Sequence, residues 1–181
     1  MEIVSIYPPH IYSIQYDGKD ENEYDRLLDE WNDIDIVLAF MEENKMYLIN
    51  DVWKNKTVED ATRQVLDEAA ALEDLFEQLA KKTKAGEKPD FDSHFHYLDG
   101  KYKYVMEYQP MKSYGTMNPS MLRLYAIKMA ENTYLITGGG IKLADKIQNS
   151  PQLKDHILQE IDAVRSWLKE NGIMDSTDME A

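Results

Sequence analysis

Cysteine is absent from this sequence of 181 residues, which excludes disulfide bonds, thiolate zinc sites and cysteine nucleophiles. Long apolar runs are also missing, because the longest uncharged apolar stretch covers residues 36–41, far short of the roughly 20 residues that cross a bilayer. The first residues contain no basic segment followed by an apolar one, so they predict no secretory signal. We therefore expect a cytoplasmic protein that has no membrane partner.

Basic residues are few and unevenly distributed. The net charge is −14, which disfavours RNA as a partner because nucleic-acid binding relies on clustered Lys and Arg. Residues 1–110 hold 25 acidic and 12 basic side chains, whereas residues 111–150 hold two acidic and five basic ones. The acidity therefore belongs to the first part of the chain, and a local excess of positive charge of +3 follows it.

The first half of the chain contains patterns of strands and then of helices. Residues 2–7 and 11–16 alternate apolar and polar side chains, which predicts one or two strands. Residues 22–43 have apolar side chains at three- and four-residue spacing, typical of one amphipathic helix or of a pair broken near Asn32-Asp33. A second long helix is expected to begin at Thr57 as its N-cap and to end at Gly86. We expect the two helical regions to form an antiparallel hairpin.

The second half predicts a small sheet and a closing helix. Strands are expected at residues 101–107, 122–129 and 133–137, the last two joined as a hairpin, with a loop at 112–120. A final helix should begin at Pro151 and stop at Gly172. We predict a single domain over residues 1–173, with a mainly helical part to residue 90 after an N-terminal strand, a sheet-and-helix part over 91–173, and a frayed tail at 174–181.

The run LRLYAIK at residues 122–128, a turn, TYLIT at 133–137 and GGGIKL at 138–143 before a helix resembles the RelE/ParE/HigB group of toxin-fold proteins. Within that group it is most similar to an uncharacterised branch seen mainly in Bacteroidetes. The resemblance covers roughly residues 94–172. It implies an α+β fold with an N-terminal helical hairpin packed on a small antiparallel sheet closed by a C-terminal helix. It also implies a toxin–antitoxin-type function.

If the chain is an enzyme, the resemblance implies a metal-independent endoribonuclease that cleaves RNA by acid–base chemistry. Such a reaction needs cations for the phosphate charge and groups that exchange protons. The candidate catalytic residues are Arg123, Lys142, His94, His96 and Tyr125, and the candidate substrate-binding residues are Lys128, Lys146 and Tyr114. We expect no metal and no cofactor.

Each candidate also has a structural interpretation. Arg123 could be a strand residue paired with a carboxylate. His94 and His96 would share one face of a strand, where they could bracket a phosphate or do nothing, because no third metal ligand follows at a suitable spacing. The glycines at 138–140 do not have the spacing of a phosphate loop, and they more simply permit a positive φ or a close backbone approach after an interior strand.

Two functions stay open from the sequence. The first is a toxin that cleaves RNA or acts on translation, with an antitoxin or another protein as its partner. The second is a catalytically inactive acidic module that binds a basic protein or mimics nucleic acid, which the charge of −13 over residues 1–110 favours. The oligomeric state is left open by both.

Overall fold

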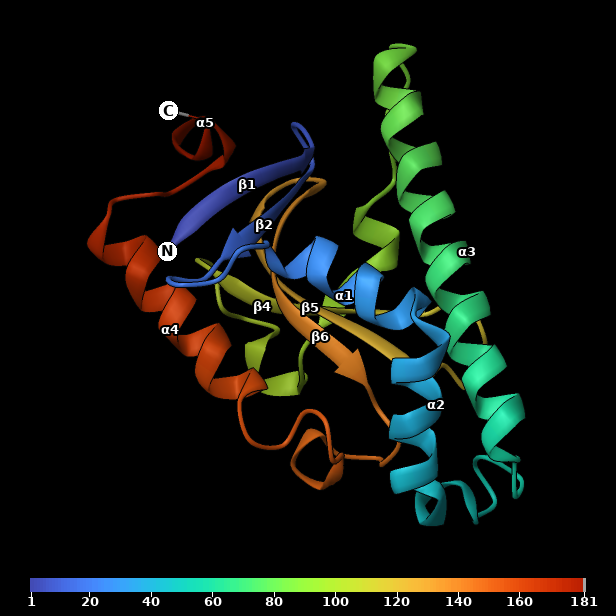
Figure 1. Ribbon diagram of the computed structural model, residues 1–181. Coiled ribbons are helices and arrows are strands. Elements are labelled where there is room, and N and C mark those ends of the chain that lie inside the picture. Colours follow the sequence, from blue (N-terminus) through green and yellow to red (C-terminus); the bar gives the residue numbers. More distant parts are fainter. Residues whose placement is uncertain (181) are drawn as a thin grey trace.

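The computed structural model describes residues 1–180, which form an α+β domain around a six-stranded mixed sheet (Figure 1). The strands are β1 (Glu2–Tyr7), β2 (Ile11–Gln15), β3 (His96–Tyr97), β4 (Gln109–Tyr114), β5 (Leu122–Ala130) and β6 (Thr133–Ile141). Their order across the sheet is β1-β2-β6-β5-β4-β3. The β2–β6 pair is parallel, and the four other neighbouring pairs are antiparallel.

The N-terminal segment corrects the expected fold. The chain begins with the hairpin β1–β2, and β2 joins the sheet through parallel pairing of Ile11 with Tyr134 and of Ser13 with Ile136. Residues 11–14 are buried, because helices cover both faces of the sheet at this point. The prediction of an N-terminal helical hairpin on a small antiparallel sheet is therefore wrong: strands come first, and the helices lie between β2 and β3 in the chain.

The helical region of the first half follows its capping residues. The helices are α1 (Glu23–Asn32), α2 (Ile34–Glu43) and α3 (Val58–Lys84). Asp33 separates the first two, because its side chain accepts hydrogen bonds from the amides of Asp35 and Ile36 and starts a new helix. Thr57 caps α3 through the amide of Asp60, which confirms the predicted break and the predicted cap. Gly86, at a φ of +78°, follows the end of α3.

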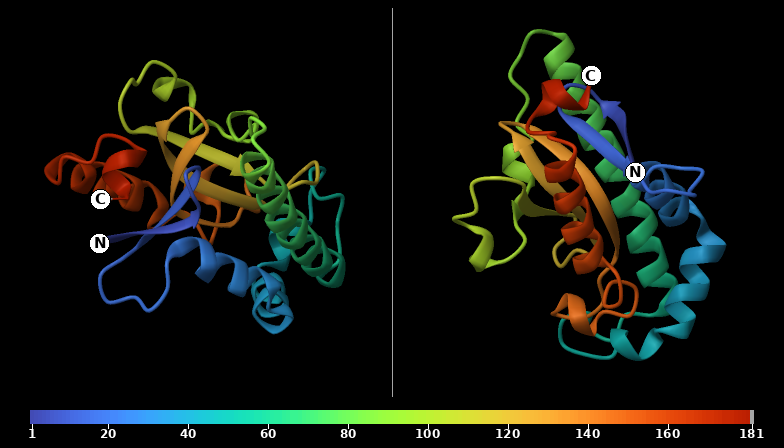
Figure 2. Two further views of the ribbon diagram at one scale, coloured as in Figure 1. Left: turned by 90° about the horizontal axis from the view of Figure 1, so that it is seen from above. Right: turned by 90° about the vertical axis from the view of Figure 1, so that its left-hand side faces the viewer.

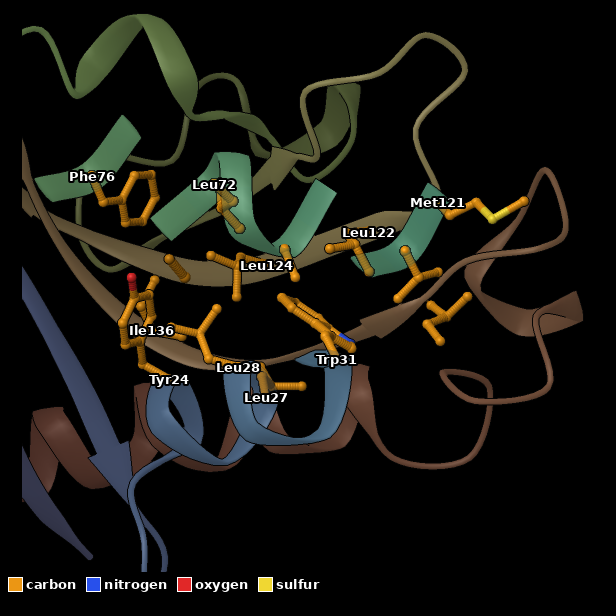
Figure 3. Packing of buried hydrophobic residues seen from close by; sticks show 14 of the residues in the cluster. Tyr24, Leu27, Leu28, Trp31, Leu72, Phe76, Met121, Leu122, Leu124 and Ile136 are labelled. Carbon is orange, nitrogen blue, oxygen red and sulfur yellow. The ribbon is translucent and has the colours of Figure 1, made fainter. Parts of the chain in front are cut away.

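The helices enclose the sheet in three layers. Figure 2 shows the sheet between α3 on one side and α4 (Ile157–Glu170) on the other. The larger core lies between the sheet and α1–α3, and Figure 3 shows Leu27 and Trp31 of α1, Leu72 of α3 and Leu124 of β5 pointing into it. Two smaller clusters lie on the α4 side. This layered burial leaves few places where a sheet side chain can reach solvent.

The hairpin β5–β6 is longer than the sequence indicated. The pairing runs from Leu122 with Ile141 to Ala130 with Thr133, so the three glycines lie inside β6 and not in a loop. None of the three has a positive φ. A Cβ on Gly139 would lie 2.5 Å from the carbonyl oxygen of Arg123 and 2.8 Å from Leu27 Cδ1. Glycine is therefore required here by close packing: of the two expected roles, the close backbone approach is confirmed and the positive φ is wrong.

Four other segments differ from expectation. The final helix, α4, begins at Ile157 and not at Pro151, and residues 151–156 form turns before it. Residues 101–107 form a short 3-10 helix and turns in place of a strand, because Tyr104 and Met106 are exposed and no partner strand lies beside them. The strand β4 lies later and includes part of the expected loop at 112–120. Residues 174–180 carry a short helix, α5 (Ser176–Met179), in place of a frayed tail. No helix in residues 1–180 has the length and apolar content needed to cross a membrane.

Candidate anion-binding site

Four polar or aromatic side chains meet on the α4 face of the sheet. Lys112 pairs with Tyr125, and Tyr114 pairs with Arg123, across the antiparallel strands β4 and β5. Directly paired residues point to the same face, and Leu122 and Leu124 fill the opposite face. The strand β6 places glycines opposite Arg123 and Tyr125, so no β6 side chain covers them.

Arg123 has no carboxylate partner within 4.0 Å among residues 1–180. Its Nη1 donates to the carbonyl oxygens of Ser120 at 3.1 Å and of Leu122 at 2.7 Å. Its guanidinium carbon lies 4.3 Å from the centre of the Tyr114 ring, a cation–π contact. Burial lowers the pKa of Arg123 below its ordinary value. Arg123 is therefore not paired with a carboxylate, in contrast to what the structural interpretation expected. It is a half-buried cation held by two carbonyl groups and the Tyr114 ring.

Lys142 and Lys112 are likewise held by backbone carbonyl groups. Lys142 Nζ donates to the carbonyl oxygens of Ala144 at 2.8 Å and of Asp145 at 2.6 Å, and Lys112 Nζ donates to that of Leu98 at 3.0 Å. Neither lysine forms an ion pair with another described residue. Burial, together with the charges of Arg123 and Lys112, lowers the pKa of Lys142 to about 8. The three cations therefore share a surface on which no carboxylate neutralises them directly.

Two cavities open around these cations. The cation cavity, of about 330 Å³, is lined by Leu98, Asp99, Lys101, Lys112, Tyr114, Arg123, Tyr125, Lys142, Asp145, Lys146, Ile147, Gln148 and Leu158. The aromatic cavity, of about 530 Å³, is lined by Tyr47, Asn50, Val52, Trp53, Pro119, Ser120, Arg123, Lys142, Leu143, Ala144 and Asp145. Arg123, Lys142 and Asp145 line both. The cation cavity contains five basic and two acidic side chains, in a chain that is strongly acidic elsewhere.

Tyr125 forms part of the floor of the cation cavity. Its side chain is 1% exposed, and its hydroxyl has no hydrogen-bond partner among residues 1–180. Burial raises the pKa of this phenol, and the positive charge of Arg123 opposes that rise. A buried hydroxyl without a partner costs free energy.

The other predicted site residues lie at different distances from this surface. His96 pairs with Lys112, and its ring centre lies 5.4 Å from that of Tyr114, so it stands beside the site. Lys146 lines the cation cavity. His94 lies in a 3-10 helix before β3 and does not share a strand face with His96. Its pKa is lowered by burial, with smaller effects of His96 and of Lys82 in α3.

Lys128 is not part of the site. It lies near the far end of β5, on the face that also carries Leu124 and Ala126, and its Nζ lies 3.0 Å from Asp92 Oδ1. In the described part of the chain, no group of three or more His, Asp or Glu side chains could hold a metal ion.

A buried carboxylate that the sequence analysis missed positions the start of β5. Glu68 of α3 is 0% exposed and accepts hydrogen bonds from Gln64 Nε2, Ser120 Oγ and the amides of Met121 and Leu122, at 2.7 to 3.1 Å. It therefore fixes the segment whose carbonyl groups hold Arg123. Glu68 lies on the apolar stripe of α3, between Val65 and Leu72, and that spacing was the signal that it was not part of a solvated face.

The aromatic cavity was also missed. Trp53 is buried, and its Nε1 donates to the carbonyl oxygen of Leu143 at 2.9 Å. This bond joins the segment before α3 to the segment after β6, far apart in the sequence. Two large apolar side chains in a polar connection, Val52 and Trp53, were a signal of a functional loop, but no local pattern indicates which distant segment they meet.

Comparison of the chain with family models, with curated proteins and with solved structures found no match. Function must therefore be argued from the site itself.

Proposed function

We propose that this chain binds the phosphate groups of RNA in the cation cavity and acts as a toxin-type, metal-independent ribonuclease. The observation that carries the proposal is the set of Lys112, Arg123 and Lys142. They line one cavity, which Asp99 and Asp145 also line, and none of the three forms an ion pair with a carboxylate of residues 1–180. Removing a cation partly from water costs free energy unless an anion binds to it. A phosphate group in the cavity would bind to all three side chains.

The charge distribution favours a ligand that contacts the protein over a small area. Arginine and lysine bind phosphate through charge-assisted hydrogen bonds, and Tyr114 beside Arg123 offers a ring on which a base could stack. The acidic helices repel the rest of a long polyanion. We therefore expect short single-stranded segments to bind better than duplexes.

Cleavage by this set would follow a transesterification without a metal. The 2′-oxygen would attack the phosphorus, the P–O5′ bond would break, and a 2′,3′-cyclic phosphate and a 5′-hydroxyl would result. Neutral Lys142 would accept the proton of the 2′-hydroxyl, since its pKa of about 8 leaves a fraction of it unprotonated near pH 7. Protonated Lys112 would donate a proton to the leaving O5′, and Arg123 would stabilise the charge on the phosphoryl oxygens.

The test is to incubate the purified chain with single-stranded RNA and with translating ribosomes. Fragments with cyclic phosphate ends are expected, and Lys142→Gln and Arg123→Gln should abolish them while urea unfolding curves show that both variants fold. Lys103→Gln is the matched control, because that lysine is exposed and lies outside both cavities. If the RNA stays intact with ribosomes and without them, the chain is not a ribonuclease. If it also fails to bind RNA at low salt, the whole proposal is wrong.

A second function is favoured by the surface of α2. Ile34 and Ile36 are 57% and 48% exposed beside Asp33 and Asp35. Exposed apolar side chains with acidic neighbours suit a basic protein partner, so we propose as the alternative a non-catalytic module that binds an antitoxin or another basic protein. A basic partner should be recovered at low salt, released at high salt, and lost with Ile34→Ser/Ile36→Ser. A partner that stays bound at high salt would exclude the electrostatic form of this alternative.

A further inference from the structure

We propose that the aromatic cavity is the base-binding part of a nucleotide site whose phosphate lies in the neighbouring cation cavity. The inference rests on the proposed function and specifies the ligand of that same site: one nucleotide unit with a planar base, a sugar and one phosphate. Three features of the molecule carry it.

The two cavities meet at the same charged residues. Arg123, Lys142 and Asp145 line both, so a phosphate bound to the two cations lies at the boundary between a basic cavity and a largely apolar one. A ligand anchored there by its phosphate can extend into the apolar side without a second charged contact. Inorganic phosphate would leave that side empty, whereas a nucleotide would fill both.

The lining of the aromatic cavity suits a flat ring. Its aromatic and apolar lining residues include Tyr47, Trp53, Val52 and Leu143, and its polar ones are Asn50, Ser120, Arg123, Lys142 and Asp145. Trp53 is fixed, since it is 5% exposed and its Nε1 is bound to the carbonyl oxygen of Leu143. Aromatic side chains that are held in place form stacking platforms for bases of any sequence.

The mouth of this cavity is apolar and exposed. Tyr47 is 38% exposed and Val52 is 58% exposed. Exposed apolar side chains around a hollow mark ligand sites. A base in the cavity would cover these two side chains.

The experiment compares inorganic phosphate, adenosine, adenosine 5′-monophosphate and a short oligoadenylate as ligands of the full chain, by titration calorimetry. The mononucleotide should bind about tenfold or more tightly than inorganic phosphate and than adenosine, because stacking adds to the ionic contact. Tyr47→Ala should remove most of that advantage and leave phosphate affinity unchanged. Tyr104→Ala is the matched control, since Tyr104 is 81% exposed and lies outside both cavities.

Fluorescence gives a second readout that does not depend on affinity alone. The mononucleotide should quench Trp53, and Trp53→Phe should remove the quenching that the remaining tryptophans, Trp31 and Trp167, do not account for. Equal affinity for phosphate and mononucleotide, or an unchanged mononucleotide affinity in Tyr47→Ala, would overturn the inference while phosphate binding at Arg123 stands.

The failure of the proposed function has a different signature. If none of the phosphate-bearing probes binds, the cation cavity is not a phosphate site and both ideas are wrong. If the mononucleotide binds more tightly than the oligoadenylate, the base-binding cavity stands but serves free nucleotides and not RNA.

Discussion

The two ends of strand β5 each carry a cation, and the two cations have different surroundings. Near one end, Lys128 Nζ lies 3.0 Å from the carboxylate of Asp92, which also accepts hydrogen bonds from the Tyr134 hydroxyl and the Asn132 amide. At the other end, Arg123 meets two carbonyl groups and the Tyr114 ring. Both cations belong to the same strand, so the segments that face them decide whether each is paired. The segment that faces Lys128 supplies a carboxylate, which neutralises its charge. The segments around Arg123 form cavities and supply no carboxylate partner, so the charge of Arg123 stays available to a ligand.

The largest expected effect comes from Glu68, the buried carboxylate that holds the start of β5, next to Arg123 in the chain. Its oxygens are taken up by four hydrogen bonds to α3 and to residues 120–122. Glu68→Ala should lower the free energy of unfolding by about 3 kcal/mol, because the buried amides and the Ser120 hydroxyl lose their acceptor. Urea unfolding measures the change. The phosphate affinity should fall as well, since the carbonyl groups that hold Arg123 move.

Asp67 is the matched control for this change, since it precedes Glu68 in α3 and is exposed. Asp67→Ala should change the free energy of unfolding by less than about 0.5 kcal/mol. An equally small effect of Glu68→Ala would show that Glu68 does not organise the Arg123 end.

An intermediate effect is expected from pH at the Arg123 end. Burial and the neighbouring cations lower the pKa of Lys142 to about 8, so its charge is present below that pH and is lost as the pH rises through it. Affinity for an oligoadenylate, whose phosphodiester charge is constant in this range, should fall about tenfold from pH 7 to pH 9. Lys142→Arg should flatten the curve, because a guanidinium stays protonated. A tenfold fall that persists in Lys142→Arg would assign the titration to another group.

The smallest effect is expected from a substitution at the Lys128 end of β5. Burial raises the pKa of Asp92, but hydrogen bonds from Tyr134, Lys128 and the Asn132 amide outweigh burial, and the pKa lies below its ordinary value. The stability that this carboxylate contributes is therefore present above its unfolded pKa, near pH 4, and is lost as the pH falls through the lower folded pKa. Asp92→Asn should reduce the free energy of unfolding at pH 7 by less than about 1 kcal/mol, since the pair is partly exposed.

The same variant should leave oligoadenylate affinity unchanged. Urea unfolding at pH 7 and pH 3 with both proteins measures the stability effect. A loss of affinity in Asp92→Asn would mean that the two ends of β5 are coupled and that their contrast is not local.

Local signals predicted the parts of the fold that depend on neighbouring residues. The helix break near Asn32-Asp33, the Thr57 cap and the β5–β6 hairpin are each determined within a few residues, and the structure confirms them. The parallel pairing of β2 with β6 has no local signal, because it depends on burial of β2 by helices from elsewhere in the chain. The strand expected at residues 101–107 failed for the opposite reason: it alternates correctly but has no partner.

The same distinction applies to the site. Arg123 and Lys142 could be named from the strand and loop pattern around them, and the structure places both in the lining of the same two cavities. Trp53 and Glu68 could not be linked to them, because Trp53 reaches the site from the connection before α3 and Glu68 from α3, and no local pattern connects either segment with β5. Lys128 was grouped with Arg123 by sequence proximity, but the alternation of the strand places it on the other face.

The parallel pairing of β2 with β6 has a consequence for how the chain is made. Residues 11–13 pair with residues 134–136, so the intervening chain of residues 14–133 must be synthesised before β2 can pair with β6. Until then β2 presents an unpaired edge to other chains in the cell. Such long-range pairing slows folding, and a chaperone that covers β2 during synthesis would keep its edge from pairing with another chain.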